Sequence, residues 1–314
     1  MTSTSASSPQ TAVLLMAYGT PYREEDIEGY YTNIRHGQRP PQPLYDQLLG
    51  RYQAIGLPSP LAKITQDQGQ GLQTLLDAQS PGKYRVYVGL KYISPFIAEA
   101  VGQIAADGIN EIIGLPLAPE YSSYSSEDYH LRAKAALEDH PGISYLPVGS
   151  WWKHSDLIDF WADQLIALGH ETDRDDAMVI FSAHSLPMRI IEGGDPYQQE
   201  VIDFMEAIAA KADLPADHYT LAWQSAGRTE EPWIGPDFVT VAKDLIASHG
   251  KKTIISASIG FISDNLEISY DVDIELANAI RQAGGSLVRL RMPNTDPQLL
   301  ATLKESVLEA DGRS

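Results

Sequence analysis

The sequence predicts an α/β fold with two lobes, each built on a four-stranded parallel sheet flanked by helices. Apolar runs of strand length alternate with longer helical patterns along nearly the whole chain. Unbroken apolar strands of this kind are typical of parallel sheets that helices cover on both faces. The runs form two groups of four, which favours two similar Rossmann-like lobes. With 314 residues and 43% hydrophobic content, the chain could form one large domain or two medium ones, and it has ample apolar content for a core.

In the first half, short apolar runs bounded by polar or turn residues predict strands at 12–18, 84–90, 110–117 and 143–149. Longer amphipathic stretches between them predict helices at 23–36, 43–56, 59–79, 94–107 and 125–139. The helix at 59–79 has a clear start, because Ser59 suits the N-cap and Pro60 suits the first helical position.

The second half repeats this alternation. Strands are predicted at 176–183, 219–224, 252–259 and 286–290. Helices are predicted at 155–169, 197–212, 237–249, 264–282 and 296–310. No linker separates the halves, and the change between them falls near Gly149 to His154. Residues 1–11 are rich in Ser and Thr, which predicts a disordered tail rather than a signal peptide and favours a cytoplasmic protein.

Composition excludes several classes of function. The chain has no cysteine, which rules out disulfides, thiolate zinc sites and a cysteine-ligated iron–sulfur cluster. Its formal net charge of -19 should repel nucleic acid and anionic membranes, and should attract metal cations. No apolar run is long enough for a membrane span. Because the net charge is strongly negative, an anionic substrate would need a local basic patch.

Two apolar runs are each followed by polar residues suited to proton transfer. One run leads into Ser182-Ala183-His184-Ser185, and the other leads through Gly260 to Asp264 and Glu267. Polar residues at the carboxyl ends of parallel strands lie where open α/β sheets bind ligands. An imidazole from one segment and carboxylates from the other suggest proton transfer and a divalent cation.

Glu267, Asp271 and Glu275 form a file of carboxylates at spacing i, i+4, i+8. On an α-helix they would share one face, roughly 6 Å apart along the axis. Like charges at this spacing destabilise an isolated helix, so the file needs an explanation. One interpretation is the solvated face of an acidic protein. The other is a track that carries cations inward or protons outward.

Motifs at the predicted strand ends resemble those of the ferrochelatase family. They are Met16-Ala17-Tyr18-Gly19-Thr20-Pro21, Gly89-Leu90-Lys91-Tyr92, Ser182-Ala183-His184-Ser185-Leu186-Pro187, Trp223-Gln224-Ser225, Pro232-Trp233-Ile234-Gly235-Pro236-Asp237 and Gly260-Phe261-Ile262-Ser263-Asp264-Asn265-Leu266-Glu267. The resemblance extends from about Ala12 to about Ala310 and is nearest to the soluble coproporphyrin ferrochelatases of Gram-positive bacteria. It implies two chelatase-type lobes, 12–150 and 151–290, with 291–314 packing back on the first.

The resemblance implies a lyase of haem biosynthesis that inserts Fe²⁺ into coproporphyrin III, giving coproheme and releasing two protons. His184 would face the pyrrole nitrogens as proton acceptor or metal ligand, with Glu267 as its partner across the pocket. Asp271 and Glu275 would pass protons on, or hold a Mg²⁺ ion as in some relatives. Tyr18 would lie on the opposite porphyrin face as an axial ligand to iron. No organic cofactor is expected.

The same resemblance assigns the contacts to the substrate. Arg35, Arg51, Ser59 and Lys91 would bind propionates, because arginine and lysine suit carboxylates. Ser122, Ser123 and Ser225 would add hydroxyl contacts, although ordinary loop positions explain these serines equally well. Trp233 would lie near the macrocycle.

The chain departs from relatives at three positions close to these motifs. His36 stands where a relative has a second arginine, and Tyr92 stands where that relative has a histidine. Both changes weaken the local positive charge. Asn265 replaces a histidine near Glu267, which removes one ionisable group and leaves the glutamate.

Two other functions remain open from the sequence. A cobalt or nickel chelatase acting on another tetrapyrrole would share the fold, but such enzymes often place two histidines at the metal, and no second histidine lies in a matching motif. A non-catalytic haem carrier could use Tyr18 or His184 as ligand but would not need the acidic file. We expect a monomer that meets other enzymes of haem synthesis only transiently.

Overall fold

The computed structural model describes residues 10–169, 176–227 and 229–312. Of the predicted disordered tail, 1–11, residues 1–9 lie outside the described residues. Thr11 belongs to the first strand and is buried. Within the described residues, no helix is long and apolar enough to cross a membrane. The chain divides into two compact units. Of the described residues, unit 1 comprises 10–118, 125–151 and 294–312, and unit 2 comprises 119–124 and those between 152 and 293.

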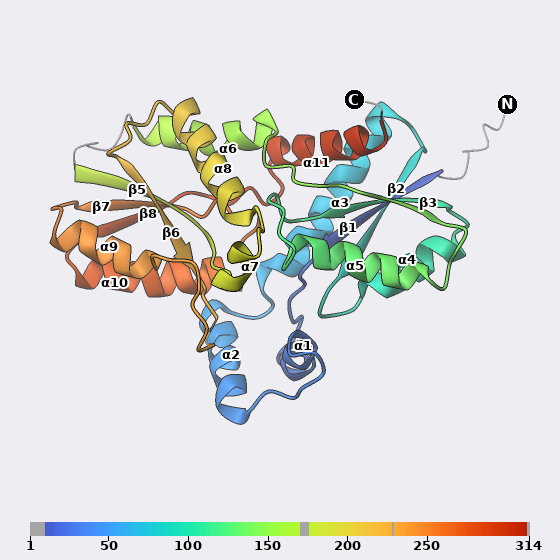
Figure 1. Ribbon diagram of the computed structural model, residues 1–314, viewed down its shortest axis with the longest axis horizontal. Coiled ribbons are helices and arrows are strands. Elements are labelled where there is room, and N and C mark those ends of the chain that lie inside the picture. The colour runs from blue at the N-terminus through green and yellow to red at the C-terminus, as the bar shows by residue number, and fades with distance from the viewer. Residues whose placement is uncertain (1–9, 170–175, 228, 313–314) are drawn as a thin grey trace. The chain divides into compact units, whose positions relative to one another are not determined.

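Unit 1 is built on a parallel four-stranded sheet with the order β2-β1-β3-β4. Its strands are β1 Thr11–Ala17, β2 Tyr84–Leu90, β3 Glu111–Pro116 and β4 Ser144–Pro147. Its helices are a 3-10 turn at Glu24–Asp26, then α1 Ile27–Ile34, α2 Gln42–Ile55, α3 Pro60–Gln79, α4 Ile97–Ala106, α5 Ser126–Leu137 and α11 Pro297–Ala310. Figure 1 shows α1 and α2 away from this sheet.

The central strand of unit 1 is buried on both faces. Leu14 and Met16 join a cluster with Val101 and Ile104 of α4. Leu15 points to the opposite face, where α3 comes so close that a Cβ at Gly69 would lie 3.8 Å from the Leu15 side chain. This two-sided burial explains why β1 reads as an unbroken apolar run.

Unit 2 repeats the architecture with the strand order β6-β5-β7-β8, again all parallel. Its strands are β5 Ala177–His184, β6 Tyr219–Gln224, β7 Thr253–Ala257 and β8 Ser286–Arg289. Its helices are α6 Ser155–Leu168, α7 Met188–Glu192, α8 Tyr197–Lys211, α9 Phe238–Ala247, a π-helix at Ile268–Leu276 and α10 Ala277–Gln282. In Figure 1, α6 and α8 cover one face of the sheet, and α9 and α10 cover the other.

The predicted fold class is confirmed: all eight strands are present within two residues of their predicted ends. Ser59 caps α3 as predicted, accepting a hydrogen bond from the Leu61 amide at 3.4 Å. The C-terminal helix α11 packs on α3, where Leu300 fills the space beside Gly71.

One element differs in kind from the prediction. The segment 264–282 is not a continuous α-helix, because Ile268–Leu276 forms a π-helix that is followed by the short α-helix 277–282. A π-helix has a wider turn with i→i+5 hydrogen bonds, so residues four apart no longer stack directly. Asp271 is accordingly buried, whereas Asp273 and Glu275 are exposed. The spacing of apolar residues in the sequence does not distinguish a π-helix from an α-helix over so short a segment.

Candidate active site

His184 is the last residue of β5, which lies between β6 and β7 in the sheet of unit 2. It pairs with Gln224 of β6. Its Nδ1 lies 2.5 Å from the carbonyl oxygen of Ser185. Because a carbonyl oxygen can only accept, Nδ1 carries the proton and donates to it. The imidazole is therefore held in the tautomer that leaves Nε2 as the basic nitrogen.

Glu267 provides the partner for that nitrogen. It immediately precedes the π-helix, and its Oε1 lies 3.5 Å from Nε2 of His184. Burial alone lowers the pKa of His184, but the hydrogen bond and negative charge of Glu267, helped by the Ser185 carbonyl, outweigh it and raise the pKa above 6.5. The pair, each member about one third exposed, can accept a proton near neutral pH.

A buried polar layer lies in the strands that carry His184. Gln224 Oε1 accepts hydrogen bonds from Ser182 at 2.9 Å and Ser258 at 3.2 Å. Gln224 Nε2 is buried and has no hydrogen-bond partner among the described residues. The layer joins the carboxyl ends of β5 and β6 with the residue after β7, so it fixes the strand end from which His184 projects.

Two residues of the site were missed by sequence reasoning. Tyr197, at the start of α8, donates its hydroxyl to the backbone oxygen of His184 at 2.9 Å. Phe261 places its ring centroid 6.4 Å from that of His184. Phe261 stood inside a motif and could have been proposed as an aromatic neighbour. Tyr197 carried no local signal, because only the packing of α8 brings it to β5.

The acidic file is not uniform. Asp271 is only 3% exposed and accepts a hydrogen bond from the Ser225 hydroxyl at 2.5 Å. Ser225 follows β6 in a left-handed conformation with φ of 59°, which non-glycine residues rarely adopt. Glu275 is exposed. Among the described residues, no group of three or more His, Cys, Asp or Glu side chains could hold a metal ion. The file therefore runs from a half-buried carboxylate through a buried one to solvent.

Ser122 and Ser123 have a carboxylate partner within unit 2. Both hydroxyls donate to Asp195, at 3.2 and 2.5 Å, and the Ser123 amide donates to the same oxygen at 2.6 Å. The other oxygen of Asp195 accepts from the Tyr197 amide at 2.9 Å. These serines thus tie the segment 119–124 to the start of α8 rather than presenting free hydroxyls.

Trp233 lies in a loop that pairs with the residues after His184. It bridges Pro187 in antiparallel fashion, and the Ile234 amide donates to Leu186 at 2.9 Å. The indole nitrogen donates to Thr229 at 2.8 Å. A Cβ at Gly227 would lie 2.3 Å from the Trp233 ring, so only glycine allows the ring to pack there. The side chain is half-buried within unit 2.

In unit 1, Tyr18 follows the fully buried strand β1 and is 43% exposed. Its ring centroid lies 4.6 Å from that of Tyr92 and 6.4 Å from that of Tyr30. The Tyr30 hydroxyl donates to the carbonyl of Gly19 at 3.2 Å. Gly19 has φ of 86°, and a Cβ there would meet Ile93 at 2.8 Å. Three tyrosines thus form an aromatic group at the carboxyl end of β1.

The predicted propionate-binding residues divide by accessibility. Lys91 is buried and pairs with Asp128 at 2.6 Å, and burial lowers its pKa. Ser59 is also buried and serves as the α3 cap. Arg35 follows α1, and its Nε is buried without a hydrogen-bond partner among the described residues. Arg51 lies in α2 beside Tyr52, whose hydroxyl is 3.2 Å from the Thr20 hydroxyl.

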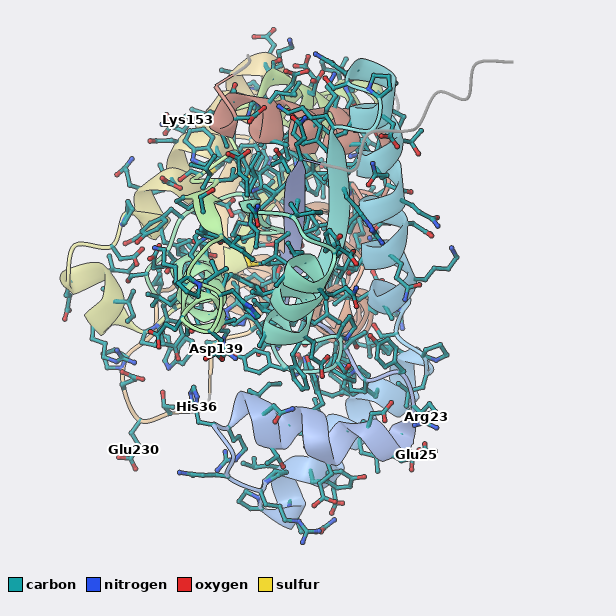
Figure 2. All side chains as sticks on the ribbon, turned by 90° about the vertical axis from the view of Figure 1, so that its right-hand side faces the viewer. Arg23, Glu25, His36, Asp139, Lys153 and Glu230 are labelled. Atoms are coloured by element: carbon teal, nitrogen blue, oxygen red, sulfur yellow. The ribbon has the colours of Figure 1, made fainter. Side chains whose placement is uncertain are left out.

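The end of α1 lies close to the aromatic group. Asn33 Nδ2 donates to the carbonyl of Tyr92 at 3.0 Å, which brings the end of α1 beside Tyr92. In Figure 2, His36 lies beyond this end of the helix, and Arg23 and Glu25 lie at its opposite end. Arg35 and His36 are therefore the ionisable residues that follow α1 directly at the end nearer the tyrosines.

Comparison with known proteins gives one consistent family. A sequence model of the ferrochelatase family matches residues 10–311. The chain is 44% identical over 301 residues to a coproporphyrin III ferrochelatase of Geobacillus kaustophilus, covering 95% of both chains. It is 42% identical over 305 residues to a coproporphyrin III ferrochelatase of Listeria innocua, covering 96% of this chain and 98% of the relative.

A solved structure supports the fold alone. SirB from Bacillus subtilis superimposes with a TM-score of 0.57 at 11% sequence identity, covering 96% of this chain and 95% of that chain. At this identity the similarity concerns architecture and carries no argument about substrate.

Proposed function

The chain belongs to the ferrochelatase family, and we propose that it inserts Fe²⁺ into coproporphyrin III, giving coproheme. The porphyrin loses its two pyrrole N–H protons as the metal enters, so the reaction releases two protons for each Fe²⁺ consumed. This substrate is the one named for the relatives that match 95% or more of both chains. No organic cofactor takes part in the proposed reaction.

The observation that carries the proposal is the His184–Glu267 pair. The Ser185 carbonyl holds the Nδ1 proton, so Nε2 is the nitrogen that can accept a pyrrole proton or contact the arriving metal. Glu267 lies 3.5 Å from Nε2 and stabilises the imidazolium that forms. We favour the base role, because a neighbouring carboxylate that raises the pKa of His184 strengthens it as a proton acceptor.

The acidic file offers an exit for that proton. Asp271 is buried beside the Ser225 hydroxyl, and Glu275 is exposed on the same π-helix. A proton that leaves Glu267 would meet a buried acceptor first and a solvated one last. Mg²⁺ at Asp271 and Glu275 fits less well, because this ion keeps several bound waters and Asp271 has little room for them. Proton transfer is therefore the proposed role of the file.

Tyr18 and the cations near it are proposed to hold the porphyrin on unit 1. An exposed phenol on an aromatic group can lie against the macrocycle and reach the iron of the product. Arg35 and Arg51 carry the fixed positive charges suited to propionates. Ser59 and Lys91 are buried and are proposed to support this surface from below.

The decisive experiment is anaerobic metal insertion with purified protein, Fe²⁺ and two porphyrins, coproporphyrin III with four propionates and protoporphyrin IX with two. We expect the protein to insert Fe²⁺ into porphyrin, with a clear preference for coproporphyrin III over protoporphyrin IX. Binding of haem without metallation of any free porphyrin would favour a carrier instead. Insertion of Co²⁺ or Ni²⁺ but not Fe²⁺ would favour another chelatase.

Location and assembly belong to the same proposal. The net charge of -19 disfavours an anionic membrane surface, so we propose a cytoplasmic enzyme that works as a monomer. Its contacts with other enzymes of haem synthesis would then be transient.

A further inference from the structure

The aromatic group of unit 1 carries a cation that the sequence motifs do not include. Tyr92 is largely buried and packs against Tyr18 with ring centroids 4.6 Å apart. Arg132 of α5 places its Cζ 5.1 Å from the centroid of the Tyr92 ring. The Arg132 guanidinium and the exposed phenol of Tyr18 therefore share Tyr92 as a neighbour.

The neighbouring lysine is not available for a ligand. The Lys91 side chain is 5% exposed, its Nζ lies 2.6 Å from Asp128, and it sits 4.5 Å from the centre of the Tyr129 ring. Its desolvation is reflected in a lowered pKa. Moving this ammonium to a substrate would leave Asp128 half-buried with one partner fewer. Lys91 is thus a structural charge under the tyrosines.

The Arg132 guanidinium is held in place by hydrogen bonds and is also partly exposed to solvent. Its Nε donates to Asp128 at 2.9 Å, and its Nη1 donates to the Lys91 carbonyl at 3.4 Å. Nη2 has no partner among the described residues, and the side chain is 34% exposed. Asp128 is shared by Lys91 and Arg132, so the three residues together carry one net positive charge. A guanidinium oriented on two sides and open on the third is suited to a carboxylate.

We propose that Arg132 binds a propionate of the porphyrin that rests on Tyr18. This inference rests on the proposed function, which supplies the anionic porphyrin. Tyr92 stacks under the guanidinium, and Asp128 fixes its orientation, so little side-chain entropy is lost on binding. Lys91 keeps Asp128 from neutralising Arg132 completely. Arg132 is therefore the residue that binds the propionate, and Lys91 contributes by pairing with Asp128.

The chain offers a closely matched control. Arg85 stacks on Tyr87 at 5.1 Å from Cζ to the ring centroid and pairs with Asp107 at 2.9 Å. Arg85 thus repeats the arginine–tyrosine–aspartate arrangement of Arg132. It lies near the start of β2, whereas Lys91 and Tyr92 follow the end of that strand. Loss of Arg85 removes the same charge and the same stacking far from Tyr18.

The test measures metal-free coproporphyrin III binding by fluorescence titration for wild type, Arg132→Gln and Arg85→Gln. A charge-assisted hydrogen bond to a partly exposed group should give about a tenfold rise in Kd for Arg132→Gln. We expect Arg85→Gln to bind within about twofold of wild type. An unchanged Kd in Arg132→Gln, or an equal loss in both variants, overturns the inference.

A second variant keeps the inference testable if Arg132→Gln is unstable. Arg132→Lys retains the charge and the ion pair with Asp128 but lacks the second N–H edge, so it should also bind several-fold more weakly. Wild-type affinity in Arg132→Lys would refute the role of the guanidinium. Failure of the proposed function is seen separately, as absence of Fe²⁺ insertion by the wild-type protein.

Discussion

Glu120 is a buried carboxyl whose ionisation should control the stability of unit 2. It is 3% exposed, and its Oε1 has no hydrogen-bond partner among the described residues. Burial raises the pKa of Glu120 from 4.5 to about 8, and the negative charge of Glu200 adds to this effect. At neutral pH the folded protein therefore keeps Glu120 protonated, whereas the unfolded chain ionises it.

The magnitude follows from linkage. Between the two pKa values the unfolded state loses a proton that the folded state retains, so stability falls by about 1.4 kcal/mol for each pH unit. The contribution is fully present below pH 4.5, falls as pH rises, and is lost above pH 8. Between pH 5 and pH 8 the wild type should lose roughly 3.5 kcal/mol from this group alone.

Glu120→Gln removes this titration and keeps the shape of the side chain. We expect the variant to gain roughly 3.5 kcal/mol relative to wild type between pH 5 and pH 8, measured by urea denaturation followed by tryptophan fluorescence. Glu206→Gln, which removes an exposed carboxylate of α8, serves as the control and should show the wild-type pH dependence. Parallel stability curves for wild type and Glu120→Gln would refute a raised pKa at this position.

Four further outcomes test the site. His184→Ala and Glu267→Gln should each lower kcat about 10²–10⁴-fold with little change in porphyrin affinity, measured by anaerobic insertion and fluorescence titration; normal turnover in His184→Ala would remove it from the mechanism. The acidic limb of the kcat/KM profile should lie above pH 6.5 in wild type and move to lower pH in Glu267→Gln, because burial then dominates the pKa of His184; a limb that stays in place would argue against the pair. Asp271→Asn should lower kcat or raise the KM for Fe²⁺ more than Glu275→Gln does, because Asp271 is buried and Glu275 is exposed; no change in either variant would support a solvated acidic face. Arg35→Ala should reduce the kcat/KM for coproporphyrin III by about tenfold or more. If the ratio of the kcat/KM values for coproporphyrin III and protoporphyrin IX does not change, Arg35 does not contribute to the choice between these substrates.

The sequence determined the fold class and the places in the fold of the two proposed catalytic residues, His184 and Glu267. Parallel strands that are buried on both faces must be continuously apolar, and the polar residues that end them must gather at one edge of the sheet. His184 after β5 and Glu267 before the π-helix could therefore be recognised from strand ends alone. The N-cap at Ser59 was equally local, because a cap depends on the residue and its immediate successors.

The tertiary structure decided which polar residues are free to act. Ser122, Ser123 and Lys91 were predicted to contact the substrate, and ordinary loop positions explained the two serines equally well. In the folded chain Asp195 accepts hydrogen bonds from the serines and Asp128 pairs with Lys91, and both carboxylates come from distant segments. Such partners depend on how α8 and α5 pack, which no spacing in the chain encodes. Tyr197 illustrates the same limit, since its hydrogen bond to His184 arises only from that packing.

The shape of the acidic file was also decided by the folded structure. Spacing of four residues predicted three carboxylates on one face of an α-helix, and the π-helix instead turns Asp271 inward and leaves Glu275 in solvent. Local sequence fixes that a segment is helical, because side-chain periodicity and backbone preference act over a few residues. Its exact winding and the burial of each carboxylate follow from contacts such as that between Asp271 and Ser225, which form only when the strands and helices pack together.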